Sequence, residues 1–293
     1  MSGSGDKWAD WVLSRGRGGQ PEAERADLDH LAPIRERVLA GGRIASGDTV
    51  LDVGAGDGLI AFGALDLVGP TGRVIFSDVS RPLLDHSRSV AERRGVADRA
   101  SFVSASADDL APIADASVDV VTTRSVLIYV EDKASAFREF HRVLRPGGRV
   151  SLFEPINRYF DPSADDFWGF DARPVRDLVQ RLWAHEGSDD EGSNEADPMM
   201  NFGERELFEH AENAGFSRIN LELVLERKPG SWVRNWDTLL KTAPNPNAST
   251  VQEAIDAALA PDEAARFEAH LKPLVDAGAG VMKSAFAYLR AVR

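Results

Sequence analysis

The segment that most constrains this 293-residue chain is residues 49–58, "TVLDVGAGDG". It begins with the β-branched and apolar residues Thr49-Val50-Leu51, which predict a short strand buried on both faces. Three glycines follow within residues 54–58, and residues 59–65 are rich enough in apolar side chains to pack one side of a helix. A buried strand, a glycine turn and a helix in this order predict a ligand-binding turn at the carboxyl end of a parallel sheet.

The pattern of strand and helix continues well beyond this turn. Helices are predicted at residues 6–15, 21–40, 80–94 and 131–144, and strands at residues 49–53, 72–78, 99–105, 117–123 and 148–154. Pro146-Gly147-Gly148 marks a turn between the last of these helices and the last of these strands. Repeated strand–helix units of this kind predict a parallel, doubly wound α/β sheet with right-handed crossovers.

After Glu154 the alternation stops. Residues 185–198, "HEGSDDEGSNEADP", are acidic and almost free of apolar side chains, so residues 185–197 are predicted to be a mobile loop. Further along, a helix is predicted at residues 203–216, a strand at 217–227, helices within 231–278 and a closing strand at 284–292. We therefore divide the chain into an N-terminal helical extension (1–44), a ligand-binding core (45–155), a lid or insert with the acidic loop (156–202) and a C-terminal part of the same domain (203–293) with a helical insert at about 229–280.

Composition excludes several functional classes. The formal net charge of −13 argues against nucleic acid and anionic membranes as partners. The absence of cysteine removes disulfides, thiolate metal sites and cysteine nucleophiles, and no metal-ligand spacing is recognisable. No stretch has the length of a signal-peptide core or of a membrane span, so a cytoplasmic location is expected.

Two acids indicate which ligand the turn binds. A dinucleotide fingerprint needs a third glycine where this chain has Leu59, which disfavours an NAD-dependent oxidoreductase. Asp52 precedes the turn, and Asp78 ends the second strand, where a carboxylate can accept both hydroxyls of a ribose. This combination resembles the class I S-adenosylmethionine-dependent methyltransferases, especially the UbiE-like small-molecule group. The similarity extends to "FVSASADDLAPIADASVDVV" and "REFHRVLRPGGRVSLFEP", which stand in the family's order and spacing.

The resemblance implies a Rossmann-like methyltransferase fold, with a seven-stranded, mostly parallel sheet and helical N-terminal and C-terminal lid segments. It also implies S-adenosyl-L-methionine as cofactor and S-adenosyl-L-homocysteine as product. The cofactor-binding residues expected from it are Asp52, Gly54, Ala55, Gly56, Gly58, Asp78, Val79, Ser106, Ala107, Asp108, Arg124 and Ser125.

The expected roles of these residues differ along the cofactor. Asp52 would lie near its amino-acid end, Asp78 would accept the ribose hydroxyls, and Val79 would pack beside the adenine. Gly54 and Gly56 would let the backbone approach closely, since a Cβ atom would obstruct the ligand.

The roles of Ser106 and Arg124 each have an alternative. At Ser106 the family often has an acid, so the Ser106 hydroxyl, Asp108 or a water would accept from the adenine amino group. Arg124-Ser125 would lie near the methionine moiety, although a buried ion pair is the alternative for Arg124.

Two residues are candidates for catalysis. Glu154 would neutralise a cationic acceptor or act as a base, or else serve only as a structural hydrogen-bond acceptor. Tyr129 would point into the acceptor pocket or form part of its wall.

These patterns together predict methyl transfer to a small-molecule acceptor through an oxygen, nitrogen or carbon nucleophile, in specialised or cofactor metabolism. A non-catalytic, regulatory S-adenosylmethionine-binding protein is the alternative. A nucleic-acid methyltransferase is disfavoured, because "TTRSVLIY" follows the fourth strand in place of an Asn/Asp-Pro-Pro-aromatic motif. We expect a roof over the acceptor pocket, built from residues 155–202, residues 231–278 and the N-terminal helices.

Overall fold

The computed structural model describes residues 5–17, 21–159, 163–186, 197–231, 233 and 235–293. The chain divides into two compact units. The first, which we call the sheet unit, comprises Leu31–Arg158, Pro198–Val224 and Phe286–Arg293. The second, the helical unit, comprises Met1–His30, Tyr159–Asp197 and Leu225–Ala285. Each unit therefore combines segments that are far apart in the sequence.

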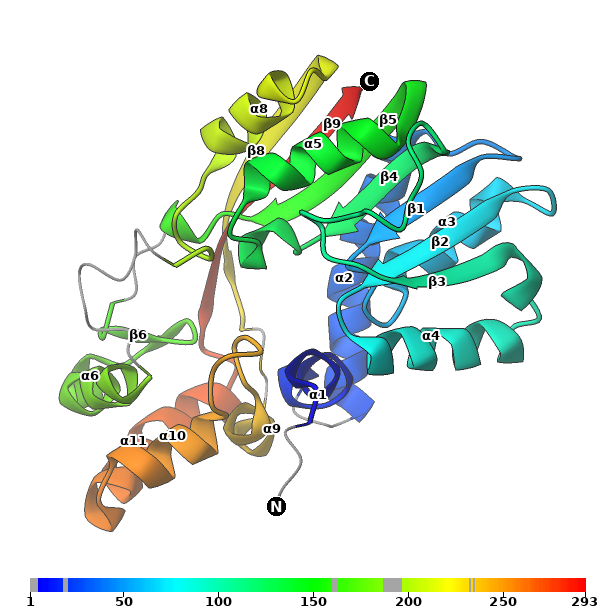
Figure 1. Ribbon diagram of the computed structural model, residues 1–293. Helices are drawn as coiled ribbons and strands as arrows, with labels where there is room; N and C mark the ends of the chain where they lie inside the picture. The colour runs from blue at the N-terminus through cyan, green and yellow to red at the C-terminus, as the bar shows by residue number, and fades with distance from the viewer. Residues whose placement is uncertain (1–4, 18–20, 160–162, 187–196, 232, 234) are drawn as a thin grey trace. The chain divides into compact units, whose positions relative to one another are not determined.

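The sheet unit is built on seven strands in the order β3-β2-β1-β4-β5-β9-β8, which confirms the predicted seven-stranded, mostly parallel sheet (Figure 1). The strands are β1 (Thr49–Val53), β2 (Arg73–Asp78), β3 (Ala100–Ser104), β4 (Val118–Arg124), β5 (Leu144–Pro155), β8 (Ser217–Pro229) and β9 (Val281–Val292). The pairs β1–β2, β1–β4, β2–β3 and β4–β5 are parallel, whereas β9 runs antiparallel to β5. The carboxyl ends of β1, β2, β4 and β5 therefore lie along one edge of the sheet.

Helices cover both faces of this sheet (Figure 1). They are α2 (Pro21–Gly42), α3 (Leu59–Val68), α4 (Arg81–Arg93), α5 (Lys133–Val143) and α8 (Glu204–Asn213). Side chains of α2, α3 and α4 share one hydrophobic core with Val50, Val74 and Val120 of the central strands. The helices α5 and α8 contact each other on the opposite face. Strand β1 is thus covered on both sides, as its apolar sequence predicts.

The Pro146-Gly147-Gly148 turn lies inside a strand rather than before it. Strand β5 begins at Leu144, directly after α5, and Leu144 pairs with Val118. The pairing then shifts and becomes regular from Arg149 onward, so the three turn residues form an irregularity in the strand. Gly147 has a φ of +80°, a conformation that glycine adopts without steric cost.

The helical unit has a hydrophobic core of its own. Its helices and strands are α1 (Lys7–Leu13), β6 (Asp166–Phe167), β7 (Phe170–Asp171), α6 (Arg176–His185), α9 (Trp236–Lys241), α10 (Val251–Ala258) and α11 (Pro261–Asp276). Phe170, Leu178, Trp236 and Phe267, from β7, α6, α9 and α11, are buried in one cluster. The hairpin β6–β7 and the helix α6 are elements that the sequence pattern did not predict. Most of the predicted mobile stretch, residues 187–196, lies outside the described residues.

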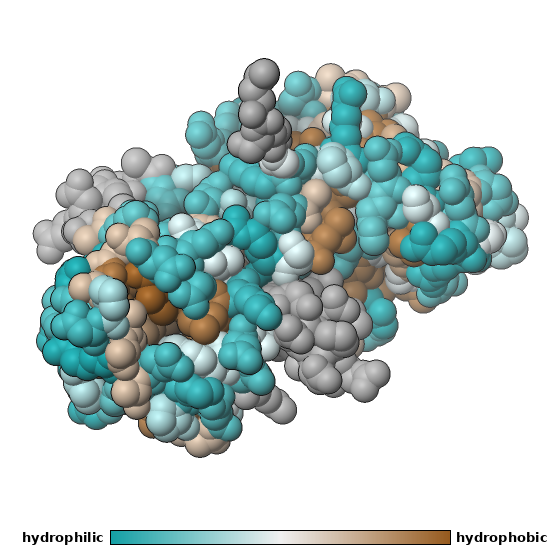
Figure 2. Space-filling view, turned by 90° about the horizontal axis from the view of Figure 1, so that it is seen from below, coloured by the Kyte–Doolittle hydropathy of each residue, from teal (hydrophilic) through white to brown (hydrophobic). Residues whose placement is uncertain are grey.

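Short 3₁₀ helices complete the described chain: η1 (Arg15–Arg17), η2 (Ala97–Arg99), η3 (Leu127–Tyr129), η4 (Asn157–Tyr159) and η5 (Arg173–Val175). Hydrophilic residues predominate on the face shown in Figure 2, with smaller hydrophobic areas between them. Within the described part of the chain, no helix combines the length and the apolar character needed to cross a bilayer.

Candidate cofactor-binding site

The three glycines of the turn after β1 have positive φ angles, but each is required for a different reason. Their φ values are +65° at Gly54, +56° at Gly56 and +89° at Gly58. A Cβ atom on Gly54 would lie 2.2 Å from Cγ2 of Val126, and one on Gly58 would lie 2.5 Å from Cε2 of Phe62. A Cβ atom on Gly56 would meet no atom within 4 Å. Only Gly56 therefore faces open space into which a ligand could come, and Gly54 is needed for packing against Val126.

Asp52 lies beneath the turn and joins three elements. Its side chain is only 2% exposed, and Oδ1 accepts a 2.7 Å hydrogen bond from the Thr122 hydroxyl of β4. It also accepts from the backbone N–H of Ala61 in the first turn of α3. Burial raises the pKa of Asp52 to about 7, against the opposing effect of these hydrogen bonds and of Arg124. Asp52 thus supports the glycine turn from the buried side.

Asp78 ties the end of β2 to the same turn. Its carboxylate accepts from the Gly56 N–H at 2.9 Å and from the Ser80 N–H at 2.8 Å. It is 6% exposed, whereas its neighbour Val79 is 51% exposed despite its apolar side chain. A carboxylate beside the glycine of this turn that faces open space, followed by an exposed apolar side chain, suits the sugar and the base of a nucleoside.

The loop after β3 lies against the end of β2. The Ala105 N–H donates to the Asp78 carbonyl at 3.2 Å. The Ser106 hydroxyl donates to the Asp108 carboxylate, and Ala107 between them is buried. Ser106 and Asp108, which the sequence offered as alternative partners for an adenine amino group, are therefore hydrogen-bonded to each other.

Glu154 lies near the end of β5, as the sequence predicts, and its carboxylate is bonded inside the protein. It is 0% exposed, and its carboxylate accepts from the N–H groups of Val126, Leu127 and Ile128 at 3.0, 3.0 and 3.1 Å. Burial raises its pKa to about 7, opposed by these three bonds and by Arg124. The geometry favours the structural alternative for Glu154, because both oxygen atoms are used inside the protein.

Arg124 and Tyr129 lie close to these acids. The Arg124 guanidinium is half-buried and forms no hydrogen bond or ion pair with another described residue, so the structure does not show the ion-pair alternative. Its charge lowers the pKa of both Asp52 and Glu154. Burial and the Glu154 carboxylate raise the pKa of Tyr129 to about 12. Tyr129 thus keeps its proton at neutral pH and is suited to donate a hydrogen bond, not to accept a proton. Ser125, between β4 and η3, has a φ of +54°.

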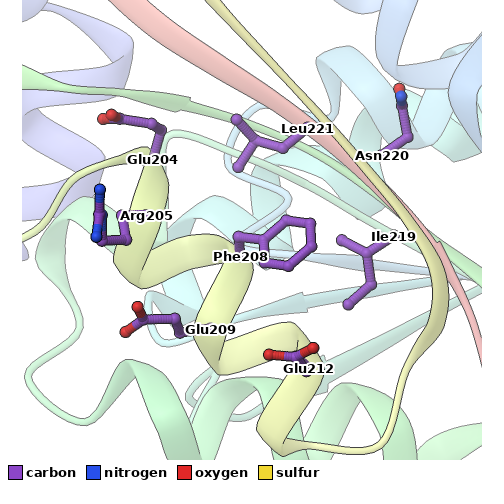
Figure 3. A pocket seen from close by; sticks show the side chains of 8 residues that line it. All are labelled: Glu204, Arg205, Phe208, Glu209, Glu212, Ile219, Asn220 and Leu221. Carbon is purple, nitrogen blue, oxygen red and sulfur yellow. The ribbon is translucent and has the colours of Figure 1, made fainter.

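A separate groove lies between α8 and β8 (Figure 3). It has a volume of about 680 Å³, and Phe208 and Ile219 point toward each other across it. Glu204, Glu209 and Glu212 stand along its helix side. None of its lining residues belongs to the glycine turn or to the strand ends described above, so we do not include it in the candidate site.

The two buried acids predict how stability depends on pH. Their pKa values are raised in the folded protein, so between about pH 4.5 and pH 7 the folded state holds protons that the unfolded state has lost. The contribution of Asp52 to the free energy of unfolding should therefore fall as pH rises from 5 to 8, by roughly 2.5 kcal/mol. Urea denaturation across this range should show a flatter profile for Asp52→Asn than for the wild type. An Asp52→Asn profile as steep as that of the wild type would contradict the prediction.

Comparisons with known proteins agree with this geometry. Residues 51–152 match a family model described as a methyltransferase domain. A ubiquinone/menaquinone biosynthesis C-methyltransferase UbiE from Hahella chejuensis is 37% identical over 135 residues, which are 45% of this chain and 53% of that protein. The UbiE of Klebsiella pneumoniae is 35% identical over 141 residues, or 47% of this chain and 56% of that protein. The chain thus spans about half the length of these relatives.

Solved structures share the fold at lower identity. The YcgJ protein from Bacillus subtilis has a TM-score of 0.55 at 16% identity, covering 89% of this chain and 98% of that chain. A geranyl diphosphate methyltransferase in complex with SAM has a TM-score of 0.52 at 18% identity, covering 96% and 93%. The strand order, the glycine turn with its two acids and the domain match lead to one conclusion. Residues 51–152 carry a methyltransferase domain that is similar to the UbiE C-methyltransferases.

Proposed function

We propose that the protein transfers the methyl group of S-adenosylmethionine to a small-molecule acceptor. The observation that carries this proposal is the open face of Gly56, next to an Asp78 carboxylate that is fixed to the same turn. The match of residues 51–152 to a methyltransferase domain supports it, and so does the similarity to UbiE proteins. The net charge of −13 favours a small molecule over nucleic acid as the acceptor. A cytoplasmic location is also part of the proposal.

The cofactor would lie along the carboxyl edge of the sheet. Asp78 would accept from the ribose hydroxyls, Val79 would contact the adenine, and the Ser106–Asp108 pair would face its amino group. Gly58 directly precedes α3 and provides no side-chain cap, which leaves N–H groups of the first turn for the methionine carboxylate. Arg124, which no described residue pairs, carries the positive charge that this carboxylate would meet.

The chemistry places modest demands on the protein. When bound, the cofactor supplies a methyl group on a sulfonium that is already a good leaving group. The residues of this chain then have to orient the two reactants and exclude water. Tyr129 would contribute a hydrogen bond, because its raised pKa keeps the phenol protonated. Glu154 has no exposed atom with which to take a proton from an acceptor.

The chemical class of the methyl acceptor is a separate question from the use of the cofactor. The named relatives act in ubiquinone and menaquinone biosynthesis as C-methyltransferases, which makes a quinol ring carbon one candidate acceptor. The methyltransferase-domain match ends at residue 152, however, and most of the helical unit follows it. Because family members build acceptor pockets from such segments, oxygen and nitrogen acceptors stay in the proposal. The predicted roof over the acceptor also stays a prediction.

An acceptor screen tests methyl transfer directly. Purified protein with S-adenosylmethionine should release S-adenosylhomocysteine in the presence of an acceptor from a panel of quinols, phenols and amines. Methylated product identified by mass spectrometry would assign the nucleophilic atom. Tight cofactor binding without turnover on any member would instead support the regulatory alternative.

A substitution at Asp78 tests the cofactor assignment. Asp78→Ala removes the carboxylate that would hold the ribose, so S-adenosylhomocysteine should bind about 1.5–3 kcal/mol more weakly in calorimetry. Asp85→Ala is the control, since Asp85 is an exposed acid of α4 whose ion-pair partner among the described residues is Arg88. Its affinity should equal that of the wild type. No binding by the wild type, or an unaffected Asp78→Ala variant, would overturn the assignment.

A pair of glycine substitutions separates backbone strain from ligand obstruction. Gly56→Val places a side chain in the open space that the cofactor would use, so binding should be lost while the protein still folds. Gly95→Val is matched to it, because Gly95 has a φ of +66° and also nothing within 4 Å. Both variants should lose about 1–2 kcal/mol of stability through strain. Only Gly56→Val should abolish binding, and equal binding by the two variants would refute an approach over Gly56.

A further inference from the structure

The segment that follows β4 is held by a single carboxylate. Glu154, near the end of β5, accepts hydrogen bonds from three successive backbone N–H groups, those of Val126, Leu127 and Ile128. The Ser125 N–H adds a 2.9 Å bond to the Phe153 carbonyl of the same strand. Three amides converge on Glu154, so its carboxylate replaces the side-chain cap that η3 lacks. The position of residues 126–128 therefore depends on Glu154.

The held segment is in contact with the cofactor turn. The space beside Gly54 is filled by Val126, whose Cγ2 atom would lie 2.2 Å from a Cβ atom on that glycine. A shift of Val126 would therefore change the packing under the first glycine of the turn. On its other side the segment leads into Tyr129, whose N–H donates to the Val126 carbonyl at 2.9 Å. One carboxylate thus fixes the support of the turn and the start of the Tyr129 segment together.

We propose that Glu154 is a positioning residue that holds residues 126–128 against the glycine turn and thereby sets the affinity for the cofactor. The proposal rests on the proposed function for its ligand and assigns Glu154 no contact with cofactor or acceptor. Its complete burial agrees with this, since a group that touches neither ligand needs no exposed atom.

The hydrogen bonds to Glu154 also predict that the affinity for the cofactor depends on pH. The carboxylate form accepts all three N–H groups, whereas a protonated carboxyl turns one oxygen into a donor that opposes them. Burial raises the pKa of Glu154 to about 7, so the switch between these forms falls near neutrality. The charged and titratable groups that act on it are Arg124 of β4 and Tyr129 of η3. On the neighbouring strand β9, the residue paired with Glu154 is the uncharged Ala287.

Asp52 must be separated from Glu154 in any pH experiment. Its pKa is also raised to about 7, and it responds to the same Arg124. Its hydrogen bonds, however, lead to Thr122 and to Ala61 of α3, not to residues 126–128. Asp52→Asn therefore removes one titration and leaves the other in place.

The test compares Glu154→Gln with a matched control. Glutamine keeps the size of the side chain but replaces one acceptor oxygen by a donor, so at least one of the three amide bonds is lost. S-adenosylhomocysteine should bind about tenfold more weakly to Glu154→Gln at pH 8, as measured by calorimetry. In the ligand-free variant, the amides of residues 126–128 should exchange hydrogen faster.

Glu139→Gln is the control. Glu139 lies on α5 and also accepts a backbone N–H, that of Leu110 at 2.8 Å, but it does not bind residues 126–128. Its affinity and pH profile should match those of the wild type. Affinity of the wild type and of Asp52→Asn should fall between pH 8 and pH 6, while that of Glu154→Gln should stay low and nearly constant.

Three results would overturn the proposal. The first is that Glu154→Gln binds S-adenosylhomocysteine as tightly as the wild type, even if its amides exchange hydrogen faster. The second is a pH dependence that persists in Glu154→Gln and disappears in Asp52→Asn, which would assign the titration to Asp52. If Glu154→Gln fails to fold, Val126→Ala tests the same coupling, and unchanged affinity in that variant is the third.

Failure of the proposed function is distinguishable from these results. If the wild type binds no S-adenosylhomocysteine, the cofactor assignment fails, and amide exchange in the ligand-free proteins still tests the coupling. Faster exchange at both residues 126–128 and residues 54–56 in Glu154→Gln would then support the positioning role. Unchanged exchange at residues 54–56 would overturn it.

Discussion

The site depends on a buried carboxylate, that of Asp52. Its hydrogen bonds to the Thr122 hydroxyl and to the Ala61 N–H join β1, β4 and α3 below the glycine turn. Burial of this carboxylate raises its pKa to about 7, and the two hydrogen bonds oppose that shift. The turn that follows β1 packs against the side chains of Val126 at Gly54 and Phe62 at Gly58. Asp78 ties the Gly56 N–H of this turn to the end of β2.

Three strand ends use the same device. Asp52 near the end of β1, Asp78 at the end of β2 and Glu154 near the end of β5 each accept backbone N–H groups of the segment that packs against them. Loops at the carboxyl edge of a parallel sheet have amides that no strand pairs, and buried amides need acceptors. Carboxylates that resemble catalytic groups in the sequence thus serve first to shape the edge. Of the three, Asp78 also stands beside the space over Gly56, which is why we assign it to the ligand.

The helical unit contains most of the segments that we expect to form the roof over the acceptor pocket. Its core combines residues from β7, α6, α9 and α11, and the described residues show no continuation of the strand–helix alternation there. The domain match that supports methyl transfer ends before most of this unit. The match therefore supports the cofactor assignment, and the acceptor pocket remains a proposal.

The sequence by itself determined the sheet, the turn and the two acids beside it, because these depend on local patterns. Apolar strands, glycines with special φ angles and residues at strand ends are all set by neighbours in the chain. The tertiary structure alone decided which glycine faces open space, since a Cβ atom on Gly54 would meet Val126 and one on Gly56 would meet no atom within 4 Å. It also decided that Glu154 binds backbone amides instead of facing an acceptor, a contact between residues 26 to 28 positions apart. The shared core of the helical unit could not be predicted either, because the stretches that form it are separated in the sequence by a stretch of the sheet unit. Contacts of this range leave no periodic signal in a single sequence.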